Sequence, residues 1–295
     1  VSVMAVNFNN FHKSLGYRAA ISETLYQENF RLAVSTDHLR HPDLDEALIA
    51  AAAAAESVAM EPRSWRKYDA ALQLNRNLYS RLFDSGPVHL DKVVRWARFA
   101  DWITGRAETL PTVRLPDSIL PAPAAVDHRT VIIQPFSAVK AKQSPLALYE
   151  AVIKSLPEDV LVVITGATGD LDGNPEYRKL LEDPRVSFDS STFAGITPVL
   201  RAATLVISVD TALMHLAVAT GTPTLCLASA AYVGEIVPYD PAITPENAQF
   251  LYQPMDCEGC LGACIHPLEE GMYRCVAALD GAKVLEAVAG YLESP

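Results

Sequence analysis

The sequence predicts an α/β protein in which strands and helices alternate and form two doubly wound parallel sheets. Residues 160–165 and 205–209 are almost purely apolar runs, rich in Val and Ile. Strands buried on both faces of a parallel sheet have this composition. Stretches with helical periodicity separate such runs. The length of 295 residues corresponds to about two domains.

The second half shows this alternation most clearly. The run 130–134 ends at Pro135, and the run 160–165 ends at Gly166, as strands do before a turn. The expected strands are 130–134, 160–165, 186–188, 205–209 and 224–227. The expected helices are 145–155, 176–182, 197–203, 212–220 and a closing helix at 281–292. This order favours a parallel sheet covered by helices on both faces.

The first half repeats the pattern less regularly. Its expected strands are 2–8, 31–36 and 68–74, and its expected helices are 15–27, 48–55 and 89–104. Four prolines fall between residues 110 and 125, a composition typical of a linker. We therefore expect an N-terminal domain at 1–125 and a C-terminal domain at 126–295.

The charge excludes some classes of function. The chain carries 24 Lys and Arg against 35 Asp and Glu, a net charge of −11, and all of the acidic excess follows residue 125. A general nucleic-acid binder needs a basic face, so no nucleic-acid partner is expected. The longest apolar run, 48–55, is far shorter than the ~20 residues of a membrane span. A cytoplasmic protein without a transmembrane segment is expected.

Polar side chains follow the strand at 130–134, before the next helix begins. They are Ser137, Lys140 and Lys142, and they fall at the sheet edge where open α/β folds bind ligands. A hydroxyl, two ammonium groups and a helix N-terminus suit an anionic phosphate. A solvated loop is the alternative interpretation.

Two further groups follow other strands. Thr211 can cap the next helix, and His215, four residues later, lies on the same helix face. With Asp210 they could hold a diphosphate, although a single His is more often structural. Asp170 and Asp172 follow a Gly turn and could bind ribose hydroxyls, or simply form that turn.

The order and spacing of these segments over 130–228 resemble glycosyltransferase family 9, the bacterial heptosyltransferases. The family's Lys-x-Trp-Pro motif reads Lys142-Gln-Ser-Pro145 here, with Ser in place of Trp. Its Asp-Thr-Gly-x-x-His motif reads Asp210-Thr-Ala-Leu-Met-His215, with Ala in place of Gly. The resemblance implies a GT-B fold, in which two Rossmann-like domains face a cleft. The second domain would bind the nucleotide sugar and the first the acceptor.

The resemblance also implies a function. An inverting transferase of this kind would move a heptose-like sugar from an ADP-sugar to lipopolysaccharide core or to a protein hydroxyl, with peripheral membrane contact allowed. No metal is expected at the sugar-transfer site. The residues that the resemblance assigns to the donor are Ser137, Lys142, Asp170, Asp210, Thr211, Met214 and His215.

The sequence departs from the family at the catalytic base. The family commonly places an Asp after a Gly in the first strand–helix loop, but Tyr17 follows Gly16 here. His12 in the same loop is the proposed base, and Asp37 is a weaker substitute. Because of this departure, the alternative interpretation is a non-catalytic family member that binds a nucleotide sugar or a partner protein. A sugar-nucleotide epimerase shares this kind of fold but has no specific motif here.

Four cysteines near the end of the chain form a possible metal knuckle at 257–275. Cys257, Cys260, Cys264 and Cys275 have the spacing C-x2-C-x3-C-x10-C, which provides four thiolates for a structural Zn or Fe. Some family members, the iron-bearing autotransporter heptosyltransferases, carry similar groups. An iron–sulfur cluster, reduced thiols and disulfides are the alternatives. Cys226 lies in an apolar strand and is expected in the core.

Overall fold

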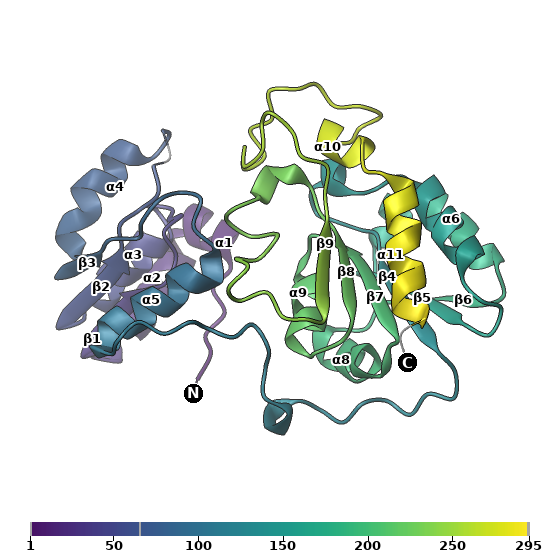
Figure 1. The fold of residues 1–295 in the computed structure, drawn as a ribbon. Helices are drawn as coiled ribbons and strands as arrows, with labels where there is room; N and C mark the ends of the chain where they lie inside the picture. Colours follow the sequence, from purple (N-terminus) through teal and green to yellow (C-terminus); the bar gives the residue numbers. More distant parts are fainter. Residues whose placement is uncertain (1, 65, 294–295) are drawn as a thin grey trace. The chain divides into compact units, whose positions relative to one another are not determined.

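A computed structural model of the chain describes residues 2–64 and 66–293. The chain divides into two compact units, Val1–Thr109 and Leu110–Pro295. Each unit contains its own parallel sheet with helices packed on it (Figure 1). No helix of the described residues is both long and apolar enough to cross a bilayer.

The second unit contains a six-stranded sheet with the order β6-β5-β4-β7-β8-β9. All of its neighbouring pairs are parallel, and Ile132 of β4 is in register with Val163 of β5 and Val206 of β7. The strands are β4 (Thr130–Gln134), β5 (Leu161–Thr165), β6 (Val186–Asp189), β7 (Leu205–Val209), β8 (Thr224–Leu227) and β9 (Ala248–Leu251). This is the strand order of a doubly wound nucleotide-binding sheet, so the predicted fold class is confirmed.

Helices cover both faces of this sheet, as the alternation of its side chains requires (Figure 1). Val131 and Ile133 of β4 belong to the core beneath α6 (Leu146–Ser155) and α11 (Gly281–Glu293). Ile132, which points the other way, belongs to the core beneath α8 (Phe193–Ala202) and α9 (Ala212–Ala219). Every residue of β4 is buried, which explains why its central residues, 131–133, are all apolar rather than alternating.

The first unit contains a smaller parallel sheet with the order β1-β2-β3. Its described strands are β1 (Leu32–Ser35), β2 (Glu56–Met60) and β3 (Arg81–Phe83). Its helices are α1 (Phe8–Lys13), α2 (Leu15–Gln27), α3 (Asp45–Ala52), α4 (Asp69–Asn75) and α5 (Lys92–Thr104). Val58 and Met60 of the central strand form its core with Phe99 of α5.

Two predicted strands of the first half are wrong. Residues 2–7 of the described chain form no regular element, and Asn7 instead caps α1 by accepting a hydrogen bond from the Asn10 N–H at 2.9 Å. Residues 69–75 form α4, in which Leu72 alone is buried. Two alanines in that helix favour the helical backbone, and one apolar anchor is too few for a strand with a buried face.

Three short strands and one helix type also differ from the prediction. Strands β2, β3 and β9 were not predicted, because each is only three to five residues long and none is a continuous β-branched run. The helix expected at 176–182 is a 3₁₀ segment, η4 (Pro175–Glu182). The Pro-rich segment packs on the second unit: the Leu115 N–H donates to the Ala219 carbonyl at 2.8 Å.

Candidate functional site

The candidate site is a crevice at the carboxyl ends of β4 and β7. The chain leaves these two neighbouring strands in opposite directions across the sheet, and open α/β sheets bind ligands at such a switch point. A cavity of about 470 Å³ lies here, formed by the loops after four strands. Its lining residues are Gln134, Phe136, Ser137, Ala138, Thr165, Gly166, Ala167, Asp170, Ser191, Thr192, Phe193, Thr211, Ala212 and Leu213.

An ion pair lies at this edge of the sheet. Lys142, on the turn η3 (Lys140–Lys142), places its Nζ 2.6 Å from Oδ2 of Asp210. The two side chains are 11% and 5% exposed, so water screens the pair only weakly. The aromatic ring of Tyr232 covers Nζ at 4.7 Å from the ring centroid. Two residues that are 68 positions apart in the sequence are thereby brought together.

His215 approaches Asp210 from the other side. Its Nε2 lies 3.9 Å from Oδ1 of Asp210. Its Nδ1 shares a hydrogen bond of 2.6 Å with the hydroxyl of Tyr239, which fixes the ring orientation. Asp210 is therefore placed between one cationic and one titratable group, and the second of these remains 36% exposed.

The start of α9 offers backbone donors to the cavity. Thr211 occupies the N-cap position, but among the described residues no side-chain cap hydrogen bond is formed there. Its hydroxyl lies instead 3.3 Å from that of Ser208. The first amides of a helix have no partner within the helix, so those of Ala212 and Leu213, which line the cavity, are available to an anion.

The remaining predicted donor residues differ in how well they are placed. Ser137 lines the cavity and accepts a hydrogen bond from the Val139 N–H at 3.2 Å. Asp170 also lines it, and one of its oxygens accepts the Ala167 N–H at 2.6 Å. Asp172 is exposed and paired with Arg178 instead. Met214 is fully buried. Like Lys142, Asp210 and His215, it is not among the residues that line the cavity.

Two properties of the cavity were not predicted from the sequence: a buried acceptor on Gln134 without a partner, and packing that requires glycine at position 166. Gln134 is buried at the end of β4, and within the described chain its Oε1 has no hydrogen-bond partner. Gly166 is needed because a Cβ there would lie 2.6 Å from the buried ring of Phe136 and 2.8 Å from Asp170. An unpaired buried acceptor costs free energy, so Gln134 is suited to receive a ligand donor.

Comparison with known proteins decides the family. The model of glycosyltransferase family 9 (heptosyltransferase) matches residues 67–257, more than half of the chain. The chain belongs to glycosyltransferase family 9. It is therefore a member of a transferase family, and the residues that line the crevice fall within the matched range. No curated protein matches the sequence.

Solved family 9 structures agree with the fold. E. coli heptosyltransferase WaaC with ADP superposes with a TM-score of 0.69 at 16% identity, over 99% of this chain and 84% of that chain. A family 9 glycosyltransferase from Veillonella parvula DSM 2008 superposes with a TM-score of 0.66 at 12% identity, over 94% of this chain and 79% of that chain. E. coli ADP-heptose lps heptosyltransferase II superposes with a TM-score of 0.61 at 14% identity, over 94% of this chain and 81% of that chain. At these identities the likeness establishes the GT-B fold.

The two candidate bases of this family 9 member lie in the first unit. His12 is exposed on α1, and its ring lies 6.5 Å from that of His41. Burial raises the pKa of Asp37, but hydrogen bonds with His38 and with the Leu39 N–H outweigh this effect and lower that pKa to about 2. A carboxylate that holds its proton so weakly is a poor general base, so Asp37 is less suitable than His12.

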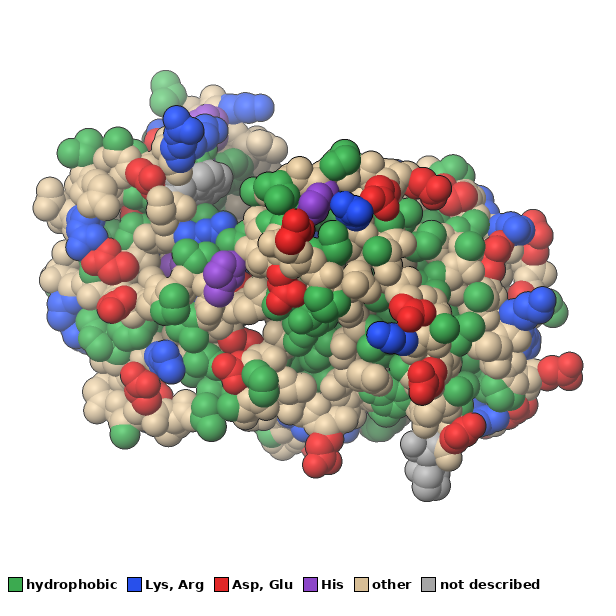
Figure 2. Space-filling model, turned by 45° about the horizontal axis from the view of Figure 1, so that its top comes forward, with side chains coloured by type: hydrophobic (Ala, Val, Ile, Leu, Met, Phe, Trp, Pro, Cys, Tyr) green, Lys and Arg blue, Asp and Glu red, His purple; other side chains and the backbone are tan. Residues whose placement is uncertain are grey.

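Three arginines of the first unit are occupied by internal contacts. Arg95 is 1% exposed and donates to four backbone carbonyls of residues 85–90. Arg76 and Arg81 pair with Glu61 and Glu56. On the face drawn in Figure 2, Lys and Arg side chains stand singly or in small groups among Asp and Glu. The drawn face therefore offers an anion small local groups of cations rather than a broad basic field.

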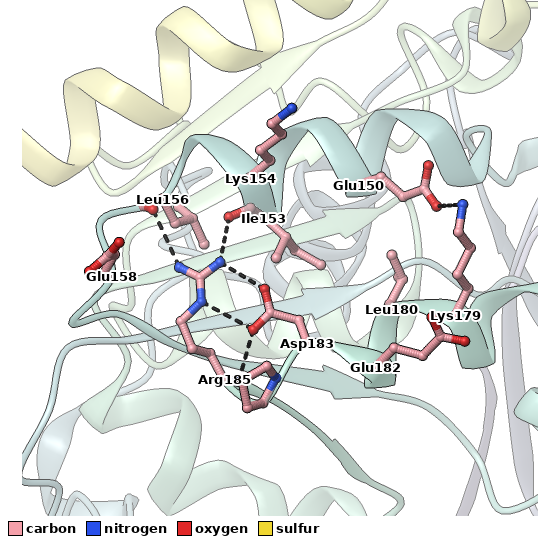
Figure 3. Close-up of a pocket in the computed structure, with 11 residues that line it drawn as sticks. Glu150, Ile153, Lys154, Leu156, Glu158, Lys179, Leu180, Glu182, Asp183 and Arg185 are labelled. Atoms are coloured by element: carbon pink, nitrogen blue, oxygen red, sulfur yellow. Dashed lines mark hydrogen bonds and ion pairs between the residues drawn. The ribbon is translucent and has the colours of Figure 1, made fainter.

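A larger hollow of about 650 Å³ lies at the opposite edge of the second sheet, before β5 and β6 begin (Figure 3). Two of the three cations that line it, Arg185 and Lys179, already have partners. The guanidinium of Arg185 binds Asp183 at 2.8 Å and the Ile153 carbonyl at 3.2 Å, and Lys179 binds Glu150 at 2.7 Å. The hollow is at the amino ends of the strands, where doubly wound folds do not bind their ligands.

The cysteine knuckle forms near the second unit's β8 end. Cys257, Cys260 and Cys264 bring their sulfurs within 4.8 Å of one another, and an alternative group combines Cys257 with Asp256 and His266. Cys275 lies outside the three-sulfur set, although its thiol interacts electrostatically with two of them. All five cysteines, which lie within the described range, are free, and Cys226 is fully buried in β8 as expected.

The electrostatics of the knuckle suit a cation. Burial, followed by the hydrogen bond with Cys264 and the neighbouring sulfurs, raises the pKa of the Cys257 thiol. Burial likewise raises the pKa of Cys275. Crowded thiols resist forming several thiolates unless a metal ion compensates the charge. The positive φ angles of Gly259 and Gly262, 75° and 87°, provide the tight turns.

Proposed function

We propose that this family 9 glycosyltransferase transfers a heptose-like sugar from an ADP-sugar to a hydroxyl acceptor, with inversion, and that the β4–β7 crevice binds the donor. The observation that carries the proposal is the pairing of Lys142 with Asp210 beside uncapped helix amides at the switch point. The family's heptosyltransferase members and the structure of WaaC with ADP support an ADP-sugar. The acceptor class is lipopolysaccharide core or a protein hydroxyl.

The chemistry follows from charge. Transfer leaves a nucleoside diphosphate, whose negative charge grows as the glycosidic bond breaks. Lys142 and the first amides of α9 would stabilise that charge, and Asp170 and Gln134 would bind ribose or sugar hydroxyls. His12 would accept the proton of the acceptor hydroxyl. This proposal needs no metal at the transfer site.

The test is a transfer assay. Purified protein is incubated with ADP-heptose and with lipopolysaccharide core or candidate acceptor proteins, and products are identified by mass spectrometry. Transfer of a heptose mass supports the proposal. Absence of both ADP binding and transfer contradicts it. His12→Ala should lower the transfer rate by about 10²-fold or more while ADP affinity is kept, because general-base catalysis contributes roughly that much.

A second candidate function is donor binding without transfer. Tyr17 occupies the place of the family's Asp, and its hydroxyl accepts a hydrogen bond from the Asn7 N–H at 3.0 Å. A phenol with this role does not replace a carboxylate base. Tight binding of ADP-heptose without product or donor hydrolysis would favour this second function.

We also propose that the knuckle holds a structural Zn or Fe ion. Cys257, Cys260 and Cys264 would supply three thiolates, and Cys275 is the candidate for the fourth. Four ligands of this kind suit either metal in a tetrahedral site. Elemental analysis of freshly purified protein tests this proposal, and less than a tenth of an equivalent of both metals would contradict it.

A further inference from the structure

The knuckle is attached by its backbone to the short segment η5 (Ala230–Tyr232), which follows β8. The Gly259 N–H donates to the Ala230 carbonyl at 2.9 Å, and the Leu261 N–H donates to the Ala231 carbonyl at 2.7 Å. Ala230 also packs in one apolar cluster with Cys275. Any change in the shape of the knuckle is therefore passed to η5.

The knuckle also holds the turn that carries Lys142. The N–H of Tyr273 donates to the carbonyl of Ala141 at 2.8 Å. Ala141 is the middle residue of η3, immediately before Lys142. The backbone of this turn thus has an anchor from a segment more than 130 residues further along the chain.

Tyr232 completes the connection through its side chain. Its ring faces Nζ of Lys142 at 4.7 Å, which is within the range of a cation–π contact. Its hydroxyl lies at the knuckle, because a Cβ on Gly262 would be 3.5 Å from both the Tyr232 and the Tyr273 hydroxyls. The same side chain therefore touches the cysteine knuckle at one end and the crevice lysine at the other.

We propose that Tyr232 is a positioning residue through which the knuckle sets the location of Lys142 and hence the affinity for the donor diphosphate. Nζ lies between this ring, at 4.7 Å, and the carboxylate of Asp210, at 2.6 Å. The inference rests on the proposed function only in taking a diphosphate as the ligand of Lys142.

The first test compares two substitutions of Tyr232. Tyr232→Phe keeps the ring over Nζ, whereas Tyr232→Leu removes it and keeps an apolar side chain. ADP affinity is measured by calorimetry. We expect Tyr232→Phe to bind ADP with an affinity within twofold of that of the original protein, and Tyr232→Leu to bind ADP about fivefold more weakly. In the transfer assay, Tyr232→Leu should raise KM for ADP-heptose and leave kcat unchanged. Equal affinity of the leucine variant and the original protein would overturn the inference.

The second test addresses the backbone link. Tyr273 has φ −59° and ψ 140°, angles that proline adopts. Tyr273→Pro deletes the N–H that holds Ala141, while Tyr273→Ala deletes the same side chain and keeps that N–H. We expect the proline variant to bind ADP at least threefold more weakly than the alanine variant. Equal affinities of the two variants would contradict the link.

The failure of this inference differs from failure of the proposed function. If the original protein does not bind ADP, the proposed donor site is wrong. If it binds ADP and both Tyr232→Leu and Tyr273→Pro bind as well as it does, only the coupling is wrong. Thermal unfolding of each variant, measured beside its matched control, shows whether a loss of affinity reflects a loss of the fold.

Discussion

Replacing Lys142 with methionine should affect the stability of the second unit and donor binding by separate routes. Methionine keeps the unbranched apolar stem and removes the charge. It leaves Asp210, 5% exposed, without its partner at 2.6 Å. Removing one partner of a buried pair costs about 3–5 kcal/mol. His215, whose Nε2 lies 3.9 Å from Asp210, can offset part of this cost. We therefore expect the free energy of unfolding, measured with denaturant, to fall by about 3 kcal/mol.

The same substitution removes a charged hydrogen bond to the donor diphosphate. Such a bond contributes about 1.5–3 kcal/mol, so ADP should bind about 10- to 100-fold more weakly in calorimetry. Adding Asp210→Asn to the Lys142→Met protein removes the uncompensated charge and should restore most of the stability, but not the affinity. ADP affinity equal to that of the original protein, in either variant, would refute the assignment of Lys142 to the diphosphate.

Three further predictions concern acid stability, cavity shape and metal content. The pKa of Asp37 is lowered to about 2 in the folded protein, from about 3.9 in the unfolded chain. Its contribution to the free energy of unfolding is therefore present above pH 4 and is lost as the pH falls toward 2. The side chain is 45% exposed, so the effect is discounted for solvent screening. Asp37→Asn should reduce the free energy of unfolding at pH 7 by about 1 kcal/mol and make that free energy depend less on pH below pH 4, as measured by urea unfolding. An unchanged pH dependence would contradict this prediction. Gly166→Ala should destabilise the second unit by about 1–3 kcal/mol and weaken ADP binding, since the added Cβ meets the buried ring of Phe136; unchanged melting and affinity would contradict it. Replacing Cys260 and Cys264 with serine should abolish metal content in elemental analysis, whereas retention of a full equivalent would exclude both as ligands.

The fold of the second half was readable from the sequence because its strands are buried on both faces. All five residues of β4 and of β7 are buried, so both strands are mostly apolar on both faces and contrast with the helices between them. In the first half, β3 has three residues and β2 has one β-branched residue. Strands with so little signal depend on tertiary packing, and local sequence does not reveal them.

Where strand ends gave the position, the sequence predicted which side chains lie close together. Lys142 and Asp210 each follow a central strand, and parallel strands bring their carboxyl ends to one edge. The partners Tyr232 and Tyr239 could not be predicted, because they lie at the end of the short segment η5 and in the loop after it. Local sequence does not reveal where such a segment runs. Met214 shows the converse: its place within the matched motif suggested a donor contact, but the helix turns its side chain into the interior.

The most direct test of the central claim is the location of the diphosphate in a crystal structure of the protein with ADP. We predict that the diphosphate oxygens lie within hydrogen-bond distance of Lys142 Nζ and of the first amides of α9. Diphosphate bound elsewhere, such as in the hollow beside Arg185 in Figure 3, would contradict the assignment of the β4–β7 crevice as the donor site.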